Sequence, residues 1–365
     1  MKTGYMLAMQ NAHAGMSDAE MIRHELRIAA QAEEYGFDVI WCAEHHFDHY
    51  SIAPDNFQLL TWLAARTKNI QLGTAAVILP WNDPLRLVEK ASVLDAVSEG
   101  RFVLGLGRGL ARMEYEAFGI DMNEARDRFD ESARMIVNAL KTGVIEGSGP
   151  YYPQKRTEIR PKPLYSFTDK LYSVAMSPDS ITAAAHLGAR MMFFIQFALE
   201  RHLPMVESYR QQYLQQHGTS APPPHAIDFV VCDRDAGRAE ELARKHLSAY
   251  YLSLLRHYEL QEGYHADLKG YESYGAAAQL IKKMGIEGAV NDYISHQVWG
   301  TPQQIFDKLE ARQRVIGTFE WNLVMSFGGI PFDVVESSTR LISEEVLPEL
   351  KTWGEDHSSP VRQSA

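Results

Sequence analysis

Short apolar runs alternate with amphipathic segments along almost the whole chain. Eight apolar runs have the length of strands, and each is followed by a segment with apolar residues at helical spacing. The runs are 3–10, 37–44, 70–80, 102–107, 171–176, 189–194, 226–232 and 319–327. The helical segments are 18–35, 55–67, 84–98, 126–142, 179–187, 200–216, 236–256 and 302–316. This alternation predicts an α/β fold, a (β/α)8 TIM barrel; a doubly wound open sheet would alternate too, but the number of units favours closure.

Residue types at the ends of two helices support these assignments. Ser17 and Asp18 open the first helix and Gly36 closes it. Thr301 precedes a proline at the start of the last crossover helix, and Gly317 stands at its end.

Two connections are longer than most loops of a compact domain. They are 143–170, rich in Pro and Gly, and 257–300, which falls between strands seven and eight. Loops longer than about 12–15 residues are usually functional or disordered. After the eighth strand, residues 332–352 are expected to form one closing helix. We therefore expect a single barrel domain over 1–353, including the insertion 257–300, and a flexible tail at 354–365.

Composition and charge narrow the class of protein. Of 365 residues, 45% are hydrophobic and 23% charged, which is typical of a soluble globular chain. The net charge of −11 disfavours nucleic acid or an anionic membrane as a partner. Cys42 and Cys232 fall in separate predicted strands, so neither a disulfide framework nor a cysteine metal site is expected. The first residues do not resemble a signal peptide and no run of about 18 apolar residues occurs, so we expect a cytoplasmic protein.

Glu44, His45 and His46 follow the second predicted strand, at the C-terminal mouth where barrel enzymes carry their chemistry. Successive strand residues point to opposite sides, so only one of the two histidines faces the mouth readily. A metal site would need ligands from other strand ends, and these offer no complementary His or Asp. A catalytic or substrate-facing histidine is therefore favoured over a metal ligand or a purely structural histidine.

Three separate elements have residues suited to a phosphate. Arg108 ends the fourth strand in GLGRGL, and Arg126 begins a later helix. Ser177 and Ser180 lie in SPDS, where a helix starts directly after the fifth strand. Arginine forks and helix N-termini both favour anions. Each element alone could be a surface ion pair or an ordinary helix cap, but together they predict a phosphate pocket.

Ala75 and Ala76 are small residues in the middle of an apolar strand. They could serve close packing, or they could leave room for a flat ring against the backbone. Composition does not decide between these interpretations.

These segments together resemble the bacterial luciferase-like flavin-dependent monooxygenases, and within them most closely the alkanal-oxidising luciferase α subunit. The resemblance covers nearly the whole chain. It rests on the segments EHHF (44–47), GTAAVILP (73–80), DPLRLVEKASVLDAVSEGRFVLGLGRGL (83–110), FGIDMNEAR (118–126), AMSPDS (175–180) and GTPQQ (300–304).

The resemblance implies an activity and its partners. A separate flavin reductase would supply reduced FMN, which would react with O2 through a flavin C4a-peroxide. The enzyme would oxygenate an aldehyde, ketone or related small apolar substrate. The insertion 257–300 would correspond to the family's mobile active-site loop, a lid that excludes water. Members of the family usually form dimers, so we expect a homodimer or a heterodimer with a related subunit.

The resemblance also implies roles for single residues. His45 corresponds to the catalytic acid/base, with Glu44 beside it, and the Ala75–Ala76 bond corresponds to a cis peptide beneath the flavin ring. The remaining cofactor-binding positions are Arg108, Glu114, Arg126, Met176, Ser177 and Ser180. No metal ligand is implied.

Two residues depart from the luciferase pattern. Gly107 stands where luciferase has a reactive cysteine, so thiol chemistry is not expected. Met176 stands where luciferase has a glutamate, which leaves the flavin contacts and light emission open.

Other functions stay open at this point. A deazaflavin-dependent hydride transfer enzyme would have the same fold, a non-catalytic flavin-binding partner subunit would lack turnover, and a metal-dependent barrel hydrolase would need bound metal. Six tyrosines in and beside the lid suggest an apolar substrate, or else packing between two helices. They are Tyr250, Tyr251, Tyr258, Tyr264, Tyr271 and Tyr274.

Overall fold

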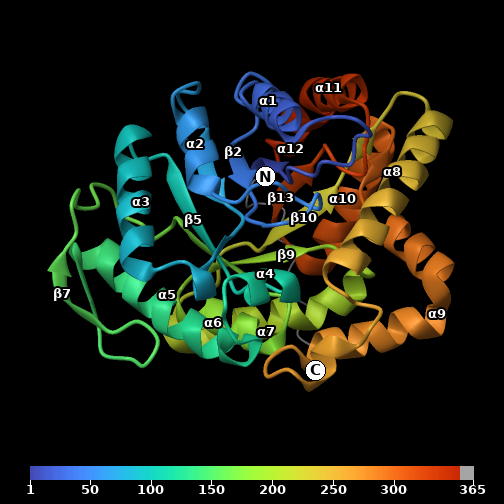
Figure 1. Cartoon of the computed structure of the whole chain (residues 1–365). Helices are drawn as coiled ribbons and strands as arrows, with labels where there is room; N and C mark the ends of the chain where they lie inside the picture. The colour runs from blue at the N-terminus through green and yellow to red at the C-terminus, as the bar shows by residue number, and fades with distance from the viewer. Residues whose placement is uncertain (354–365) are drawn as a thin grey trace, which may run out of the picture.

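A closed barrel of parallel strands forms the centre of the molecule, with helices outside it (Figure 1). This computed structural model describes residues 1–353, and the predicted tail at 354–365 lies outside the described residues. The barrel closes because the last strand pairs with the first and β3 pairs with β5. The strands are β1 (Thr3–Leu7), β2 (Val39–Cys42), β3 (Gln71–Thr74), β4 (Val77–Ile78), β5 (Phe102–Gly107), β8 (Leu171–Val174), β9 (Arg190–Phe194), β10 (His225–Phe229) and β13 (Glu320–Val324). The predicted (β/α)8 barrel is confirmed.

The helices follow the predicted order with small shifts at their ends. They are α1 (Asp18–Ala29), α2 (Asn56–Ala64), α3 (Pro84–Val97), α4 (Arg112–Ala117), α5 (Ala125–Thr142), α6 (Pro178–His186), α7 (Leu199–His217), α8 (Ala236–His257), α9 (Glu272–His296), α10 (Pro302–Ile316), α11 (Phe332–Leu341) and α12 (Leu347–Leu350). The first helix ends at Ala29, earlier than predicted, and turns continue to Gly36. Thr301 forms the expected N-terminal capping box of α10 with Gln304. Within residues 1–353, no helix is both long enough and apolar enough to cross a bilayer.

The predicted strand 70–80 is two strands in the structure. A cis peptide bond between Ala75 and Ala76 separates β3 from β4, so the bond expected from the resemblance is present. Both strands still pair with β5.

The connection 143–170 contains a β-hairpin that the sequence did not predict. Strands β6 (Val144–Gly147) and β7 (Gln154–Glu158) pair antiparallel and extend away from the barrel at the left of Figure 1. Pairing within the hairpin satisfies backbone groups that a long open loop would leave to solvent.

The segment 257–300 lies between β10 and β13, as expected from the order of the strands. It contains a short 3-10 turn (Tyr264–Asp267), helix α9 and strand β12 (Trp299–Gly300). Strand β12 pairs with β11 (Val231–Cys232), which continues from β10. Helices α8 and α9 lie at the right of Figure 1.

A layer of large side chains fills the barrel interior. The ring of Trp41 lies 4.8 Å from the rings of both Tyr172 and His225. Gly4 and Gly73 make room for the indole, because a Cβ atom would lie 2.6 Å from it at Gly4 and 2.3 Å at Gly73. This packed layer supports the C-terminal ends of the strands, where the cavity lies.

Candidate active site

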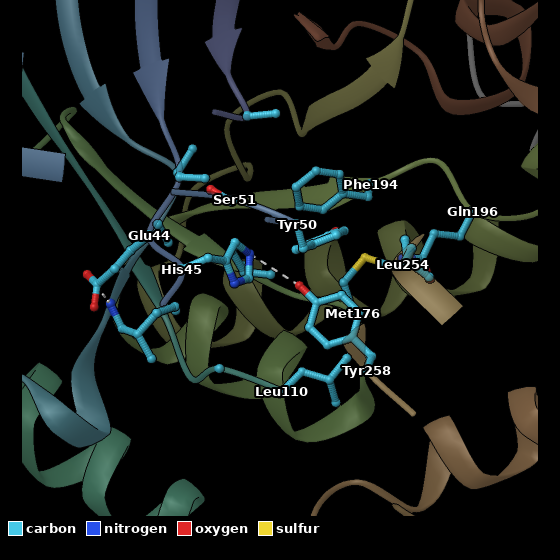
Figure 2. A pocket seen from close by; sticks show the side chains of 18 of the residues that line it. Glu44, His45, Tyr50, Ser51, Leu110, Met176, Phe194, Gln196, Leu254 and Tyr258 are labelled. Atoms are coloured by element: carbon cyan, nitrogen blue, oxygen red, sulfur yellow. Dashed lines mark hydrogen bonds between the residues drawn. The ribbon is translucent and has the colours of Figure 1, made fainter. Parts of the chain in front are cut away.

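A cavity lies at the C-terminal ends of the barrel strands, between the strands and helices α8 and α9 (Figure 2). Its empty volume, including the solvent in the open mouth, is about 1220 Å³. Eight of the predicted site residues line it: Glu44, His45, Ala75, Ala76, Arg108, Glu114, Met176 and Ser180. Arg126 and Ser177 lie outside this lining, and Arg126 lines a neighbouring surface hollow with Asp179.

His45 is held between a carboxylate and a hydroxyl group. Its Nδ1 lies 3.0 Å from Glu114 Oε1, and its Nε2 lies 3.3 Å from the hydroxyl of Tyr258. Figure 2 shows the Tyr258 ring facing the imidazole across the cavity. An ionised carboxylate can only accept, so Nδ1–H donates to Glu114 and Nε2 accepts the proton of Tyr258. The accepting nitrogen of His45, Nε2, therefore lies on the cavity side of the ring, where the Tyr258 hydroxyl is its present partner.

Glu114 remains ionised although its side chain is only 1% exposed. Burial alone would raise its pKa, but the neighbouring His45 charge, the His45 hydrogen bond and the backbone N–H of His46 hold the pKa of Glu114 below its usual value. The His46 N–H lies 2.8 Å from Glu114 Oε1. A buried carboxylate with these donors keeps the imidazole in one tautomer.

Glu44 has a different environment from His45. Its carboxylate accepts from the Trp81 indole at 2.7 Å and the Asn82 amide at 2.9 Å. It also accepts from the Ile78 backbone at 3.2 Å, and His46 Nε2 lies 3.3 Å away. These contacts hold the turn after β4, so Glu44 positions the cavity wall. The His46 ring itself packs against Phe118 and Trp81, with ring centres 4.8 and 5.9 Å away.

Two arginines carry buried donors that the protein does not pair. Arg108 Nη1 and both Nε and Nη1 of Arg126 have no hydrogen-bond partner among the described residues. Burial lowers the pKa of Arg126, and the neighbouring Arg108 charge lowers it further, although Asp130 lies 3.0 Å from Nη2. Buried, unpaired guanidinium groups are costly unless an anion binds to them. The pair therefore fits a phosphate group.

The two predicted serines form the N-terminal cap of α6. Ser177 Oγ and Ser180 Oγ lie 2.9 Å apart, and Ser180 Oγ accepts from the Ser177 backbone at 2.8 Å. The helix cap, one of the two interpretations of this segment, is therefore present. The hydroxyls would have to reorient to contact a phosphate.

The wall beneath these groups is flat and small. Ala75 and Ala76 are both buried and line the cavity. Ile78 and Ala76 leave little room for a side chain at position 107. A Cβ at Gly107 would lie 2.8 Å from Ile78 Cδ1 and 3.1 Å from Ala76 Cβ. A cysteine at 107 would require the Ile78 side chain to move.

Residues of the 257–300 segment reach the predicted phosphate pocket. Arg108 Nη2 donates to the Gly270 carbonyl at 2.7 Å, and the Arg108 guanidinium lies 3.8 Å from the centre of the Tyr271 ring. Arg112 forms an ion pair with Glu259. No site role for Gly270 or for the Tyr258 hydroxyl was predicted from the sequence. The sequence shows only that a long insertion contains glycines and several tyrosines. These residue types do not predict which residues they contact.

His257 completes a cluster of possible metal ligands with His45 and Glu114. The three donor atoms lie within 4.8 Å of one another, and His257 Nε2 is 3.9 Å from Glu114 Oε1. Tetrahedral zinc at about 2.1 Å from each donor places ligands about 3.4 Å apart, so these side chains would have to move closer. Burial and the neighbouring His45 charge lower the pKa of His257 to about 4. His257 was not among the residues predicted from the sequence. It directly follows the predicted helix 236–256 and lies far along the chain from the EHHF segment.

Known proteins resemble the chain over most of its length. The sequence model of the family described as luciferase-like monooxygenase matches residues 1–318. The alkanal monooxygenase alpha chain of Photorhabdus luminescens is 26% identical over 352 residues, covering 92% of this chain and 94% of that protein.

Solved structures share the fold at lower identity. The oxygenating constituent of 3,6-diketocamphane monooxygenase from Pseudomonas putida, in complex with FMN, superposes with a TM-score of 0.72 at 20% identity, covering 96% and 98% of the two chains. An F420-dependent secondary alcohol dehydrogenase superposes with a TM-score of 0.69 at 15% identity, covering 94% and 98%.

Proposed function

Because the chain belongs to the luciferase-like monooxygenase family, we propose that it is the oxygenating component of a two-component monooxygenase that uses reduced FMN and O2. Its substrate would be a small, largely apolar organic molecule. A separate flavin reductase would deliver the reduced cofactor, and the active protein would be a dimer. The observation that carries the proposal is the His45–Glu114 pair, which faces the same cavity as Arg108, whose Nη1 has no hydrogen-bond partner among the described residues.

The residues present fit FMN. Arg108 and Arg126 would bind its phosphate, because their buried donors lack partners among residues 1–353. Ala75 and Ala76 would support the isoalloxazine ring. When bound, reduced FMN would supply the two electrons that activate O2.

His45 would move a proton at its Nε2 atom. Glu114 keeps the Nδ1 proton in place, so Nε2 can take a proton from the substrate oxygen and return it. Glu114 also stabilises the imidazolium that forms, as a carboxylate does beside a catalytic histidine. Tyr258 reaches Nε2 from the 257–300 segment, so that segment would complete the site and exclude water.

Glu44 would act as a positioning residue. Both of its oxygens already accept hydrogen bonds from the turn over 78–82, which leaves His45 as the proton carrier.

The first test follows reduced FMN in air with and without the protein. We expect the protein to delay the release of H2O2 relative to free reduced flavin. An aldehyde, ketone or arene that is a substrate should lower the H2O2 yield further. Reoxidation as fast as in buffer, with H2O2 as the product, would contradict the proposal and favour a deazaflavin cofactor or a non-catalytic subunit.

A pair of variants tests the role of His45. His45→Ala should still bind FMN, as followed by flavin fluorescence, but should release most of the consumed O2 as H2O2. His49→Ala is the matched control, since His49 lies in the same loop with its side chain 72% exposed. Substrate oxygenation by His45→Ala at the wild-type yield would refute the assignment.

A further inference from the structure

The cavity has two halves with different chemistry. One half contains His45, Ala75, Ala76, Arg108 and Ser180, from β2, β3, β5 and α6 and the turns that follow them. The other half lies between β1, β9, β10 and β13 on one side and helices α8 and α9 on the other. Seven aromatic side chains line this second half and its junction with the first: Tyr50, Phe194, Phe229, Tyr250, Tyr258, Tyr274 and Tyr293.

Several of these rings lie against one another at moderate angles. The planes of Tyr50 and Tyr250 differ by 30°, and those of Tyr250 and Tyr293 by 31°. Phe229 lies 3.9 Å from Tyr250, centre to centre, at 33°. Aromatic side chains gathered along one part of a cavity suit a flat aromatic ligand, which can stack against such rings with an offset or meet them edge to face.

Further aromatic contacts hold this wall from behind. Tyr251 stacks on Tyr293 at 4.5 Å and 16°, and Phe327 meets Phe229 edge to face at 5.1 Å. A supported wall keeps its shape, so it would favour a rigid flat ligand over a flexible chain, which loses more conformational freedom on binding.

Three tyrosine hydroxyls mark the end of the aromatic half nearest His45. Tyr50 and Tyr250 lie 2.8 Å apart, hydroxyl to hydroxyl, and Tyr258 donates to His45 Nε2. Burial raises the pKa of Tyr50 to about 12 and those of Tyr250 and Tyr258 well above the usual value, so all three hold their protons. Two hydroxyls that share one hydrogen bond have one O–H left to donate. Figure 2 shows Tyr50, Phe194 and Tyr258 around the same space as His45.

Charged side chains in the lining belong to the other half or to the junction at His45. They are Glu44, Arg108 and Glu114. The residues that line the aromatic half from the strands opposite α8 and α9 have apolar side chains or, at Gln196, an amide side chain. A neutral ligand therefore fits the aromatic half better than an anion or a cation.

We propose that the aromatic half binds a flat, uncharged hydroxyarene, such as a phenol of one or more fused rings, with its hydroxyl group directed to His45 and Tyr50. This inference rests on the proposed function for its reaction. One atom of O2 would enter a ring C–H bond and the other would leave as water: arene C–H, O2 and reduced FMN give the hydroxylated arene, water and oxidised FMN. His45 accepting the phenolic proton would raise the electron density of the ring that is oxygenated.

Binding by the flavin-free full-length protein tests the ligand class directly, by calorimetric titration. The probes are 2-naphthol, naphthalene and decanal, which have the same number of carbon atoms. We expect 2-naphthol to bind at least about tenfold more tightly than either of the others. Naphthalene lacks the hydroxyl, and decanal lacks the flat ring.

Two variants locate the site. Tyr293→Leu should weaken binding of 2-naphthol about fivefold or more and leave decanal nearly unchanged, while Tyr213→Leu on α7, outside the cavity, should change neither. FMN binding by each variant, followed by fluorescence, checks that the barrel is folded.

The outcomes separate the two proposals. Three results would overturn the hydroxyarene site and leave the proposed flavin function standing. Decanal could bind as tightly as 2-naphthol, naphthalene could bind as tightly as 2-naphthol, or no probe could bind to a protein that still binds FMN. Binding of 2-naphthol by a protein that does not bind FMN would support the aromatic site and refute the proposed function.

Discussion

The buried carboxyl group of Glu25 predicts a specific dependence of stability on pH. Glu25 lies on the inward face of α1 with 0% exposure, and neither of its oxygens has a hydrogen-bond partner among the described residues. Burial raises the pKa of Glu25 from 4.5 to about 7. The unfolded chain therefore releases this proton at a lower pH than the folded protein.

The magnitude follows from the difference between the two pKa values. At about 1.4 kcal/mol per pKa unit, a shift from 4.5 to about 7 corresponds to roughly 3 kcal/mol. This stabilisation is fully present below pH 4.5 and is lost as the pH rises through about 7. Glu25→Gln keeps the shape of the side chain and removes the titration. We expect the variant to be about 3 kcal/mol more stable relative to wild type at about pH 8 than at about pH 4.

Urea unfolding followed by tryptophan fluorescence, at several pH values in this range, measures the difference. Subtracting the wild-type free energy of unfolding cancels the titration of groups that both proteins share. Glu34→Gln is the matched control, because Glu34 is exposed and should give no pH-dependent difference. A difference between Glu25→Gln and wild type that stays constant with pH would refute the reasoning.

Three further predictions concern the candidate site and the arginines beside it. Arg126→Ala should lower affinity for FMN at least about tenfold and leave affinity for riboflavin, which lacks the phosphate, unchanged in fluorescence titrations; an equal loss for both flavins would contradict the phosphate assignment. Gly270→Ala should weaken FMN binding more than the control Gly15→Ala. Both glycines have positive φ, but only a Cβ at position 270 would meet Arg108, at 2.6 Å from Nη1. Equal FMN titration curves for the two variants would count against this contact. Glu114→Gln should lower coupled oxygenation about 10²-fold and retain FMN, since an amide no longer selects the His45 tautomer; an unchanged ratio of H2O2 to product would exclude this role.

Local patterns were enough to predict the barrel and much of the candidate site. The strand and helix periods differ, so their alternation could be recognised without tertiary contacts. Because parallel strands of a barrel all end at the same face, Glu44, Arg108 and Ser180 could be expected to lie near one another. The structure places all three in the cavity lining.

Contacts between distant segments could not be predicted in the same way. Tyr258 reaches His45 across 213 positions of sequence, and Gly270 reaches Arg108 across 162. The sequence shows that the insertion contains this tyrosine and this glycine, but it does not predict which residues they contact. The same holds for Glu25, whose position in the apolar stripe of α1 does not reveal whether its carboxyl group is paired.

The sequence by itself determined the order of the strands and helices, the helix caps and the residue types at the strand ends, because these depend on neighbours along the chain. Only the tertiary structure decided that Glu114 pairs with His45, that His257 joins them, and that helices α8 and α9 provide an aromatic wall. The physical reason is that packing of those helices on the barrel sums many weak contacts, and shifting α8 by one residue would turn a different side chain toward His45.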